Sequence, residues 1–401
     1  MHGDAEADFT AEVRRRATTA EVQRAGWRAA RAALSDAAKS AFPAPGAPPQ
    51  VVDRLDASSC SVAAFRTRFI AARVPAVLTG LVEVLAQPYD DDDRPSGGAA
   101  PGAPGAADAP SPPSGLEGAA APSAVGGAGC GGLDRDGWLE WLARTCGTKR
   151  VVVAVQGDEG MGCSSSMMLL GDLVARLQSG RAHGLYLYDV CVSKRLPHVL
   201  RYMRLPRHFA HCYLRRTMHA HAFSRSWPTL FLGARGTRST LHLDQWEGHF
   251  YMYCLFGCKR WVLFHPEDVA LLYPDWSHGG LHPRFPSLYE LQAQPQRYPL
   301  FAHARRREVV IHPGEVLFVP GGTPHAVENL TDSLALAGNF VDASNLDEAV
   351  AEMRWLGRVD EGVGAAAAAL AQIDWETTPD GGSIDERAGL PPAQLVTSFP
   401  E

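Results

Sequence analysis

Three residues in this chain have the chemistry and the spacing of a metal site. His242 and Asp244 are separated by one residue. A strand places residues i and i+2 on the same side, so this imidazole and this carboxylate face the same way. His325 follows the stretch Gly321-Gly322-Thr323-Pro324, a turn that starts a fresh strand and can aim a second imidazole at the first pair. The three side chains together predict a site for one divalent metal.

Two imidazoles and one carboxylate leave coordination positions open on a metal. This ligand set is typical of non-haem Fe(II) oxygenases, in which co-substrate and oxygen occupy the open positions. A single His-x-Asp is nevertheless a weak signal, because the chain has 15 histidines and Asp244 could be an ordinary turn residue. The elements around the three residues must therefore decide between the two interpretations.

A lysine on a hydrophobic stretch adds a group that could bind an anion. Lys259 shares a face with Trp261 and Leu263, because side chains alternate along a strand. An unpaired charge that points into an apolar interior is very costly, so Lys259 predicts an anionic partner, such as the far carboxylate of a dicarboxylate co-substrate. The alternative is a lysine whose stem lies along the apolar surface while its ammonium reaches water.

Closely spaced strand signals surround these residues and indicate how they are positioned. Gly, Pro and Asp separate eight short runs, which predict a mainly β chain with flanking helices and an antiparallel barrel or two-sheet roll at its core. The runs lie at 228–233, 239–245, 249–255, 259–264, 308–312, 315–319, 325–329 and 333–341. Further strands are predicted at 51–55, 74–80, 150–155 and 185–189, and helices at 133–146, 168–178 and 345–359.

Composition divides the chain into three parts. Residues 1–49 predict an N-terminal helical extension, and residues 50–355 the main domain. Residues 88–132 consist almost wholly of Gly, Ala, Pro and Ser after a run of Asp; they cannot bury enough apolar surface to fold, and we expect a disordered insertion. Residues 356–401 predict a C-terminal tail that is partly disordered.

Charge, cysteine usage and hydropathy limit the partners and the compartment. The net charge of −6 disfavours nucleic acid as a partner. The eight cysteines include no CxxC pair, which favours reduced thiols in an intracellular protein. We find no apolar run near the ~18–20 residues that a membrane span needs, and no secretory signal. We therefore expect a soluble protein of the nucleus or cytoplasm; an organellar transit peptide remains the alternative, because residues 11–40 are rich in Ala and Arg.

The order and spacing of these residues resemble a Jumonji-C (JmjC) domain. The resemblance covers residues 50–355 and is strongest to small JmjC-only proteins of the protein-hydroxylase type. It implies a double-stranded β-helix of the jelly-roll or cupin kind, with Fe(II) as the metal, 2-oxoglutarate as the co-substrate and O2 as the oxidant. The residues that carry it are His242-Leu243-Asp244, Gly257–Phe264, Pro313–His325 and Gly338-Asn339-Phe340.

The resemblance also implies a role for each site residue. It makes His242, Asp244 and His325 the catalytic residues and the iron ligands. The C5 carboxylate of 2-oxoglutarate would pair with Lys259, and further co-substrate contacts would come from Ser239, Tyr186 and Asn339. Asn339 shares its face with two alanines, which leaves room for a ligand beside it.

This chain departs from the family pattern in two places. Thr323-Pro324 stands where family members often carry bulky aromatic residues, and the hydrophobic stretch 250–253 stands where many carry an Asn. His249, five residues after Asp244, could compete as a metal ligand. A second cluster of histidines is interpreted as surface or rim residues rather than as a second metal site: His208, His211, His219 and His221.

The predicted activity is hydroxylation of a protein side chain, with release of succinate and CO2. Three alternatives stay open: demethylation of N-methyl-lysine or N-methyl-arginine, oxidation of an RNA base, and a non-catalytic cupin protein that kept its metal for structure. The expected partner is a protein or peptide substrate, without a membrane. A homodimer through the helix at 345–359 is possible, and a helix that covers the barrel of its own chain is the alternative.

Overall fold

The computed structural model describes most of the predicted main domain. The described residues are 48–80, 134–157, 160–197, 199, 207–209, 212–216, 228–275, 283–357 and 360–372. Nearly all of the predicted N-terminal extension, the whole predicted insertion at 88–132 and the end of the predicted tail lie outside these residues.

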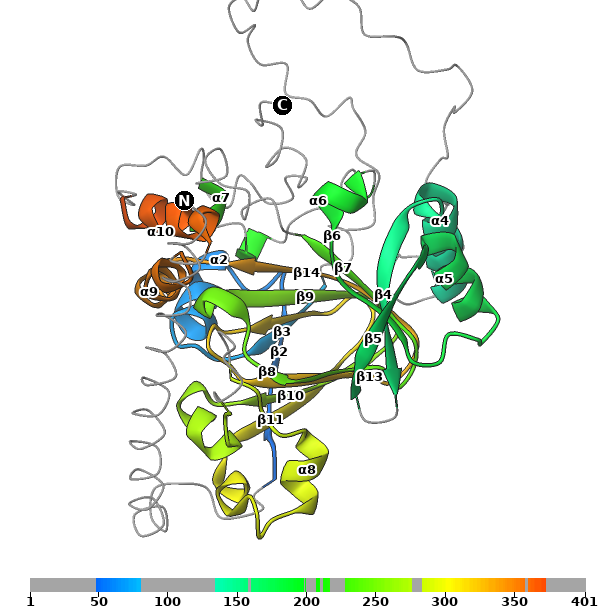
Figure 1. Cartoon of the computed structure of the whole chain (residues 1–401). Helices are drawn as coiled ribbons and strands as arrows, with labels where there is room; N and C mark the ends of the chain where they lie inside the picture. Colours follow the sequence, from blue (N-terminus) through cyan, green and yellow to red (C-terminus); the bar gives the residue numbers. More distant parts are fainter. Residues whose placement is uncertain are drawn as a thin grey trace, which may run out of the picture.

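Two β-sheets face one another and form the centre of the molecule (Figure 1). The smaller sheet consists, in spatial order, of β1 (Gln50–Val51), β11 (Arg306–Ile311), β10 (Lys259–Phe264), β13 (His325–Asn329) and β8 (Arg238–His242). The larger sheet consists of β2 (Asp53–Asp56), β3 (Ala76–Thr79), β12 (Val316–Val319), β9 (His249–Phe256), β14 (Ser333–Phe340), β7 (Thr229–Gly233), β6 (Leu185–Cys191), β4 (Arg150–Gly157) and β5 (Gly160–Leu169).

The chain passes back and forth between the two sheets. From β7 to β14 it contributes four strands to each sheet, and most neighbouring strands pair antiparallel. The parallel pairs are β1 with β11 and β2 with β3. The predicted jelly-roll core is confirmed, and all eight predicted runs from 228 to 341 are strands.

Apolar side chains fill the space between the sheets. Alternation turns Trp261 and Leu263 of β10 inward, where they meet Phe250 and Met252 of β9. Arg260, between Lys259 and Trp261, points outward and pairs with Glu328 on the solvent side. The metal-site strands β8 and β13 therefore lie on a packed interior that fixes which face of each strand looks inward.

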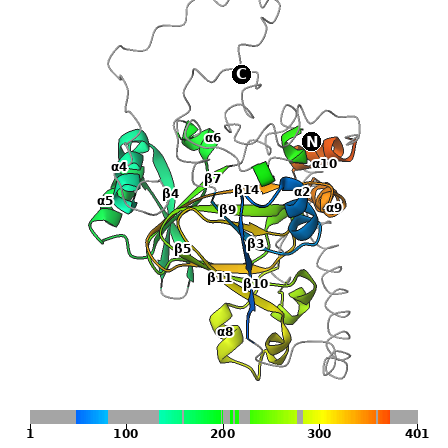
Figure 2. The same ribbon diagram turned by 180° about the vertical axis from the view of Figure 1, so that it is seen from behind.

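Helices cover the outside of the sheets at three places. The helices are α2 (Val62–Phe65), α4 (Arg135–Cys146), α5 (Leu170–Gln178), α6 (Val192–Arg195), α7 (Tyr213–Arg216), α8 (Leu288–Ala293), α9 (Leu346–Leu356) and α10 (Glu361–Gln372). Figure 2 shows α4 with α5 on one side of the barrel, α9 with α10 on the other, and α8 beside β10 and β11. A π-helix (Arg66–Ile70) continues α2, and short 3-10 turns occur at Arg207–Phe209, Gln245–Glu247, Pro266–Leu272 and Pro299–His303.

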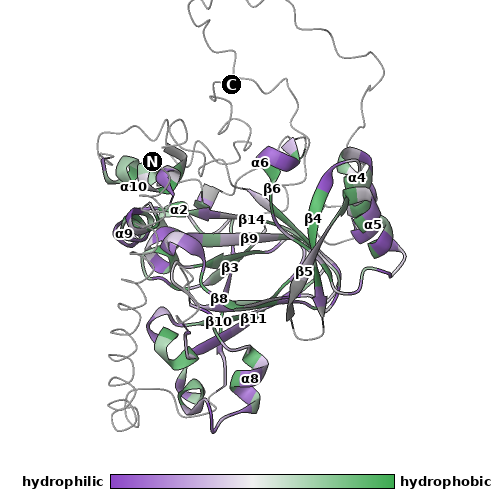
Figure 3. Cartoon of the chain, viewed as in Figure 1, coloured by the Kyte–Doolittle hydropathy of each residue, from purple (hydrophilic) through white to green (hydrophobic). Residues whose placement is uncertain are grey.

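The helix pair α4 and α5 shows why these segments fold as they do. Asp134 caps α4 by accepting a hydrogen bond from the backbone N–H of Gly137. Trp138 and Leu142 of α4 then pack with Leu173 of α5 in the same buried cluster as the strand residue Val153. In Figure 3, β4 is coloured hydrophobic along most of its length; Val151 and Val153 face the buried cluster, whereas Val152 between them is exposed.

The structure differs from the sequence-based expectation at two places. Residues 160–167 form most of β5, which the sequence did not predict because Gly and Ser interrupt any alternation; pairing with β4 stabilises this strand. It also takes in Met168 and Leu169, so the helix predicted from 168 begins at Leu170. Within the predicted tail, residues 361–372 form α10, whose Val363, Ala367 and Leu370 are buried in the core cluster with α9.

Two further predictions can be compared with the described residues. Six cysteines whose side chains the structure describes (60, 146, 191, 212, 254 and 258) are free thiols, as the composition indicated. No helix in the described part of the chain is both long and apolar enough to cross a membrane.

Candidate metal centre

His242, Asp244 and His325 converge at one end of the space between the sheets. His242 ends β8, His325 begins β13, and the two residues are directly paired across these strands. The Nε2 atoms of His242 and His325 lie 3.8 Å and 3.9 Å from Oδ1 of Asp244. One ligand atom from each residue lies within 4.8 Å of the other two, so the group could hold a metal ion.

Each of these imidazoles is oriented by its own backbone. His242 donates from Nδ1 to the carbonyl oxygen of Thr240 over 2.6 Å, and His325 donates from Nδ1 to the carbonyl oxygen of Thr323 over 2.9 Å. A carbonyl oxygen can only accept, so the proton of each neutral ring must be on Nδ1. The Nε2 lone pairs that point towards Asp244 are then available to a metal.

Burial keeps one of the two histidines neutral. The side chain of His325 is 3 % exposed, whereas that of His242 is 37 % exposed. Burial, together with the nearby His242, lowers the pKa of His325 to about 4 against the opposing effect of Asp244. A neutral imidazole is the form that binds a metal, so His325 is ready as a ligand at physiological pH.

The turn after Asp244 is strained. Trp246 and Glu247 have φ angles of 63° and 48°, in the left-handed region that residues with a Cβ rarely adopt. On the other side of the carboxylate, Asn339 of β14 donates from Nδ2 to Oδ2 of Asp244 over 3.4 Å. The side chain predicted to lie near the co-substrate therefore also contacts the carboxylate of the candidate metal centre.

Lys259 is buried deeper in the same interior. Its side chain has no solvent exposure, and Nζ donates to Oδ1 of Asn329 over 2.7 Å. The ammonium lies 5.4 Å from the ring centroid of Tyr186 and 6.0 Å from that of Phe231. Among the described residues, no carboxylate forms an ion pair with Lys259. A buried cation with neutral partners is a place where an anion would be stabilised.

The structure brings some of the other predicted residues into the same region. Tyr186 places its ring beside the Lys259 ammonium, as described above. Ser239 lies on β8 opposite Val327, two residues from the position of Asn329 on β13. Ser239 and Lys259 are thus on the same sheet, separated by β13.

Two other histidines of the described part of the chain, His249 and His208, do not belong to this centre. His249 is buried 5 residues beyond Asp244, but its ring nitrogens contact Gly321 and Ser344, not the three candidate ligands. His208 was interpreted as a surface or rim residue, and this interpretation is wrong: it is 1 % exposed and packs against Phe65. Its aromatic neighbours, far apart in the sequence, explain why spacing alone did not reveal this burial. His211, His219 and His221 lie outside the described residues.

Sequence reasoning missed two residues of this region. Asn329 accepts from Lys259 and from Ser333 at its Oδ1 and donates to Thr237 from Nδ2, each over 2.7 Å. Asn329 lies opposite Lys259 on the neighbouring strand, and the sequence could not show this because it does not give the register of β10 and β13. Asp189 was missed because it is the last residue of the strand predicted at 185–189, where a single carboxylate gives no sign of a functional role.

Asp189 adds a second negative charge near Asp244. Its φ angle of 53° falls at a register shift between β6 and β7. Partial burial and the charge of Asp244 both raise the pKa of Asp189, while a hydrogen bond with Thr229 opposes them. The exposed side of the candidate centre therefore carries two carboxylates.

Comparison with known proteins agrees with this geometry. Residues 146–345 match a family model described as a cupin-like domain. HSPB1-associated protein 1 of Rattus norvegicus is 33 % identical over 31 % of this chain and 27 % of its own length. The 2-oxoglutarate and iron-dependent oxygenase JMJD4 of Mus musculus is 33 % identical over 29 % of this chain and 27 % of its own length. The arginine-specific demethylase JMJ20 of Arabidopsis thaliana is 28 % identical over 29 % of this chain and 24 % of its own length.

The matches span about a quarter of the length of these curated relatives. The matched domain includes all three candidate metal ligands and Lys259. Residues 146–345, about half of the chain, thus form a cupin-like domain, and part of this chain is similar to JmjC-type proteins.

Proposed function

We propose that this protein is an Fe(II)- and 2-oxoglutarate-dependent oxygenase. The single observation that carries the proposal is the convergence of His242, Asp244 and His325, with each Nδ1 bonded to a backbone carbonyl and each Nε2 left for a metal. These donors fit iron, because two imidazoles and a carboxylate on one face leave the remaining positions open. When bound, iron and 2-oxoglutarate would supply the oxidising chemistry, with succinate and CO2 as co-products.

The chain's own residues would bind and orient the two small molecules. Lys259 would pair with the far carboxylate of 2-oxoglutarate, and Asn329 would hold the ammonium in place. Ser239 and Tyr186 are further candidates for contacts with the co-substrate. Asn339 would orient the Asp244 carboxylate as a ligand. The apolar side chains between the sheets would exclude bulk water from this interior.

A turnover assay tests the proposal. Purified protein with Fe(II), ascorbate and 2-oxoglutarate should form succinate above the background without protein, and His242→Ala should abolish this activity. Arg260→Ala, on the outer face of β10 in the same sheet, is the control and should retain activity. Equal succinate formation by the wild type and His242→Ala would contradict the proposed function.

We further propose that the main substrate is a cationic side chain of a protein or peptide. Asp189 is exposed near Asp244 and is not one of the candidate ligands, so its carboxylate would attract Lys or Arg beside the loaded centre. Hydroxylation is our first candidate reaction. Demethylation of N-methyl-arginine is the second, favoured by the same carboxylate and by the likeness to an arginine-specific demethylase.

Mass spectrometry of peptide products separates the two reactions. Hydroxylation adds one oxygen to the peptide, whereas demethylation removes a methyl group and releases formaldehyde. Asp189→Asn should weaken activity towards Lys or Arg peptides and leave uncoupled succinate formation in place. Undiminished peptide turnover by Asp189→Asn would remove this carboxylate from substrate binding.

A further inference from the structure

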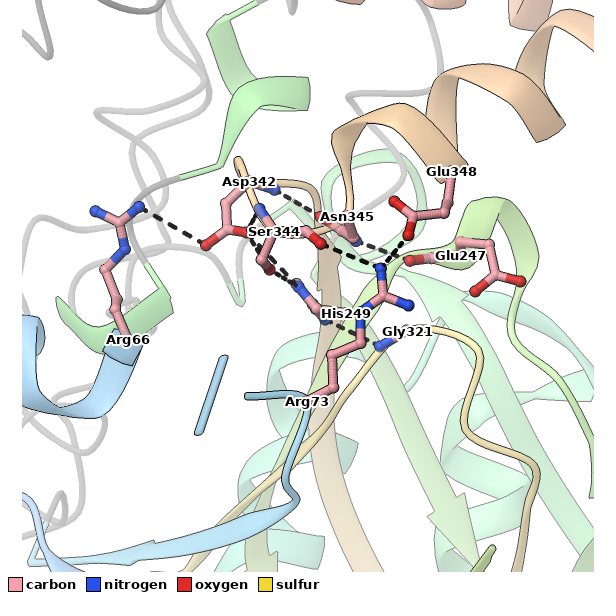
Figure 4. Close-up of polar contacts among 9 residues, drawn as sticks. All are labelled: Arg66, Arg73, Glu247, His249, Gly321, Asp342, Ser344, Asn345 and Glu348. Atoms are coloured by element: carbon pink, nitrogen blue, oxygen red, sulfur yellow. Dashed lines mark hydrogen bonds and ion pairs between the residues drawn. The ribbon is translucent and has the colours of Figure 1, made fainter. Parts of the chain in front are cut away.

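His249 lies between the turns that carry the candidate ligands. It begins β9, has no solvent exposure, and places its ring 5.0 Å from that of Phe340 and 5.6 Å from that of Phe318. Figure 4 shows the imidazole at the centre of a polar network that joins strands and turns far apart in the sequence. This buried network is separate from the direct contacts of the metal centre.

The hydrogen bonds of His249 fix the position of its proton. The backbone N–H of Gly321 donates to Nδ1 over 2.9 Å, so Nδ1 must carry a lone pair. Nε2 lies 2.8 Å from Oγ of Ser344, whose own hydroxyl donates to Oδ1 of Asp342 over 2.7 Å. The Ser344 oxygen must then accept from Nε2–H. His249 is therefore a neutral imidazole with its proton on Nε2.

The bond to Gly321 acts on the turn that orients His325. The N–H of Thr323 donates to the carbonyl oxygen of Pro320, which closes a turn around Gly321. The carbonyl oxygen of Thr323 in turn accepts the Nδ1 proton of His325 over 2.9 Å. A shift of the turn at Gly321 would thus move the acceptor that sets the orientation of the His325 ring.

A second arm of the network reaches the strained turn after Asp244. Asn345 accepts from the backbone N–H of Asp342 over 2.9 Å and donates from Nδ2 to the carbonyl oxygen of Glu247 over 2.7 Å. The same carbonyl oxygen lies against Gly321, where an added Cβ would approach it to 2.0 Å. The two ligand-bearing turns are therefore in backbone contact and are held from the same side.

Charged residues fix the turn Asp342–Asn345 itself. Burial raises the pKa of Asp342, but the nearby His249, 3.7 Å away, and the hydrogen bonds from the hydroxyl and backbone N–H of Ser344 outweigh it and hold the pKa at about 2, so the residue is a carboxylate. Arg66 lies 3.8 Å from this carboxylate, and Arg73 donates to the carbonyl oxygen of Ser344 over 3.1 Å. Arg73 also pairs with Glu348 on α9. In Figure 4, Arg66 approaches Asp342 from the left, whereas Arg73 and Glu348 lie to the right of Asp342.

We propose that His249 is a positioning residue, which holds the turn before His325 and the turn after Asp244 in the arrangement that binds the metal. This inference rests on the proposed function, because it concerns the same metal. It assigns to His249 no contact with the metal or the substrate. Outer partners of metal ligands commonly change metal affinity by about tenfold to hundredfold when they are removed.

Metal titration of the whole chain tests the proposal without reference to turnover. We expect His249→Phe, which keeps an aromatic ring but cannot accept from Gly321 N–H, to weaken Mn(II) binding by about tenfold or more in calorimetry. His249→Asn keeps an oxygen acceptor near the Nδ1 position and should recover part of the affinity. The thermal unfolding midpoint of each metal-free variant is measured in parallel.

His208→Phe is the matched control. His208 is equally buried, hydrogen-bonds from Nε2 to the carbonyl of Cys60, and belongs to neither ligand-bearing turn. Its substitution should lower the unfolding midpoint while Mn(II) affinity stays at the wild-type value. If His249→Phe is likewise less stable but binds Mn(II) like the wild type, His249 is an ordinary core residue and the proposal is overturned.

Two further outcomes keep the test decisive. If His249→Phe does not fold, Ser344→Ala removes the acceptor of Nε2–H by deleting one hydroxyl, and wild-type Mn(II) affinity in that variant would overturn the proposal. If the wild type itself fails to bind Mn(II) or Fe(II), the proposed function fails first, and the positioning role falls with it. If the wild type binds metal and forms succinate, and His249→Phe binds Mn(II) with the same affinity as the wild type, only the positioning role of His249 is contradicted.

Discussion

His325 and His249 are both buried and both hydrogen-bond to the turn at residues 321–323, one as a donor and the other as an acceptor. His325 gives its Nδ1 proton to the carbonyl oxygen of Thr323, whereas His249 takes the N–H of Gly321 at Nδ1. The first contact leaves Nε2 unprotonated and directed at Asp244; the second leaves the proton on Nε2 and directs it to Ser344. The residue type is the same in both places. The hydrogen-bond partner at Nδ1 makes His325 a candidate metal ligand and His249 a structural residue.

The spacing of histidines in the sequence does not distinguish a metal ligand from a structural histidine. His249 follows Asp244 closely enough to compete as a ligand, and only its partners exclude it among the described residues. Those partners come from 321 and 342–344, more than seventy residues further along the chain. Ligand identity therefore depends on tertiary contacts.

The largest effect should follow from removing a ligand of the first kind. His325→Ala should reduce metal binding and succinate formation to the background, because a carboxylate and one imidazole hold a metal poorly. Calorimetric titration with Mn(II) and a succinate assay measure the two losses. Retained activity in His325→Ala would contradict the assignment of His325, in contrast to His249, as a metal ligand.

The next effect concerns acid stability. The folded-state pKa of His325 is about 4, below the value of about 6.5 for an unfolded chain, so the unfolded state binds more protons between these values. The free energy of unfolding of the metal-free protein should therefore fall by about 3 kcal/mol in total from this residue as the pH falls from 6.5 to 4.

Urea denaturation at a series of pH values measures this loss. Burial lowers the pKa of His249 as well, so it contributes in the same direction. His325→Gln should flatten the pH dependence without removing it. A wild-type stability that is constant across this range would contradict the neutral assignment of both rings.

Lys259→Ala should spare the metal and weaken the co-substrate. Loss of a charge-assisted hydrogen bond costs about 1.5–3 kcal/mol, which corresponds to about tenfold to hundredfold in 2-oxoglutarate affinity. Titration of 2-oxoglutarate into the Mn(II)-loaded protein measures it, with Arg260→Ala as the control on the outer face of the same strand. Unchanged affinity would remove Lys259 from its proposed role.

A smaller effect is expected from Asn329→Asp. The new carboxylate would pair with the Lys259 ammonium that Asn329 now contacts over 2.7 Å, and would compete with the co-substrate for it. We expect about a tenfold loss of 2-oxoglutarate affinity from an added charge-assisted hydrogen bond of this kind. Mn(II) affinity should be unchanged. Tighter 2-oxoglutarate binding in this variant would show that Lys259 does not meet the co-substrate.

Much of the fold and of the candidate centre could be predicted from the sequence. Period-two alternation placed Lys259 on the inner face with Trp261, and turn residues separated the eight strands from 228 to 341. The rest depends on interactions that spacing does not encode. β5 is a Gly- and Ser-rich strand that depends on its pairing with β4, and Asn329 meets Lys259 only through the register of β10 and β13.

The most direct test is nuclear magnetic resonance of the protein labelled with 15N-histidine, before and after addition of Zn(II) as a diamagnetic probe. At neutral pH we expect His242 and His325 as Nδ1–H tautomers whose Nε2 signals shift when Zn(II) binds. His249 should be an Nε2–H tautomer that keeps its proton in the loaded protein. Zn(II)-dependent loss of the Nε2 proton of His249, or unshifted Nε2 signals of His242 and His325, would contradict the metal centre described above.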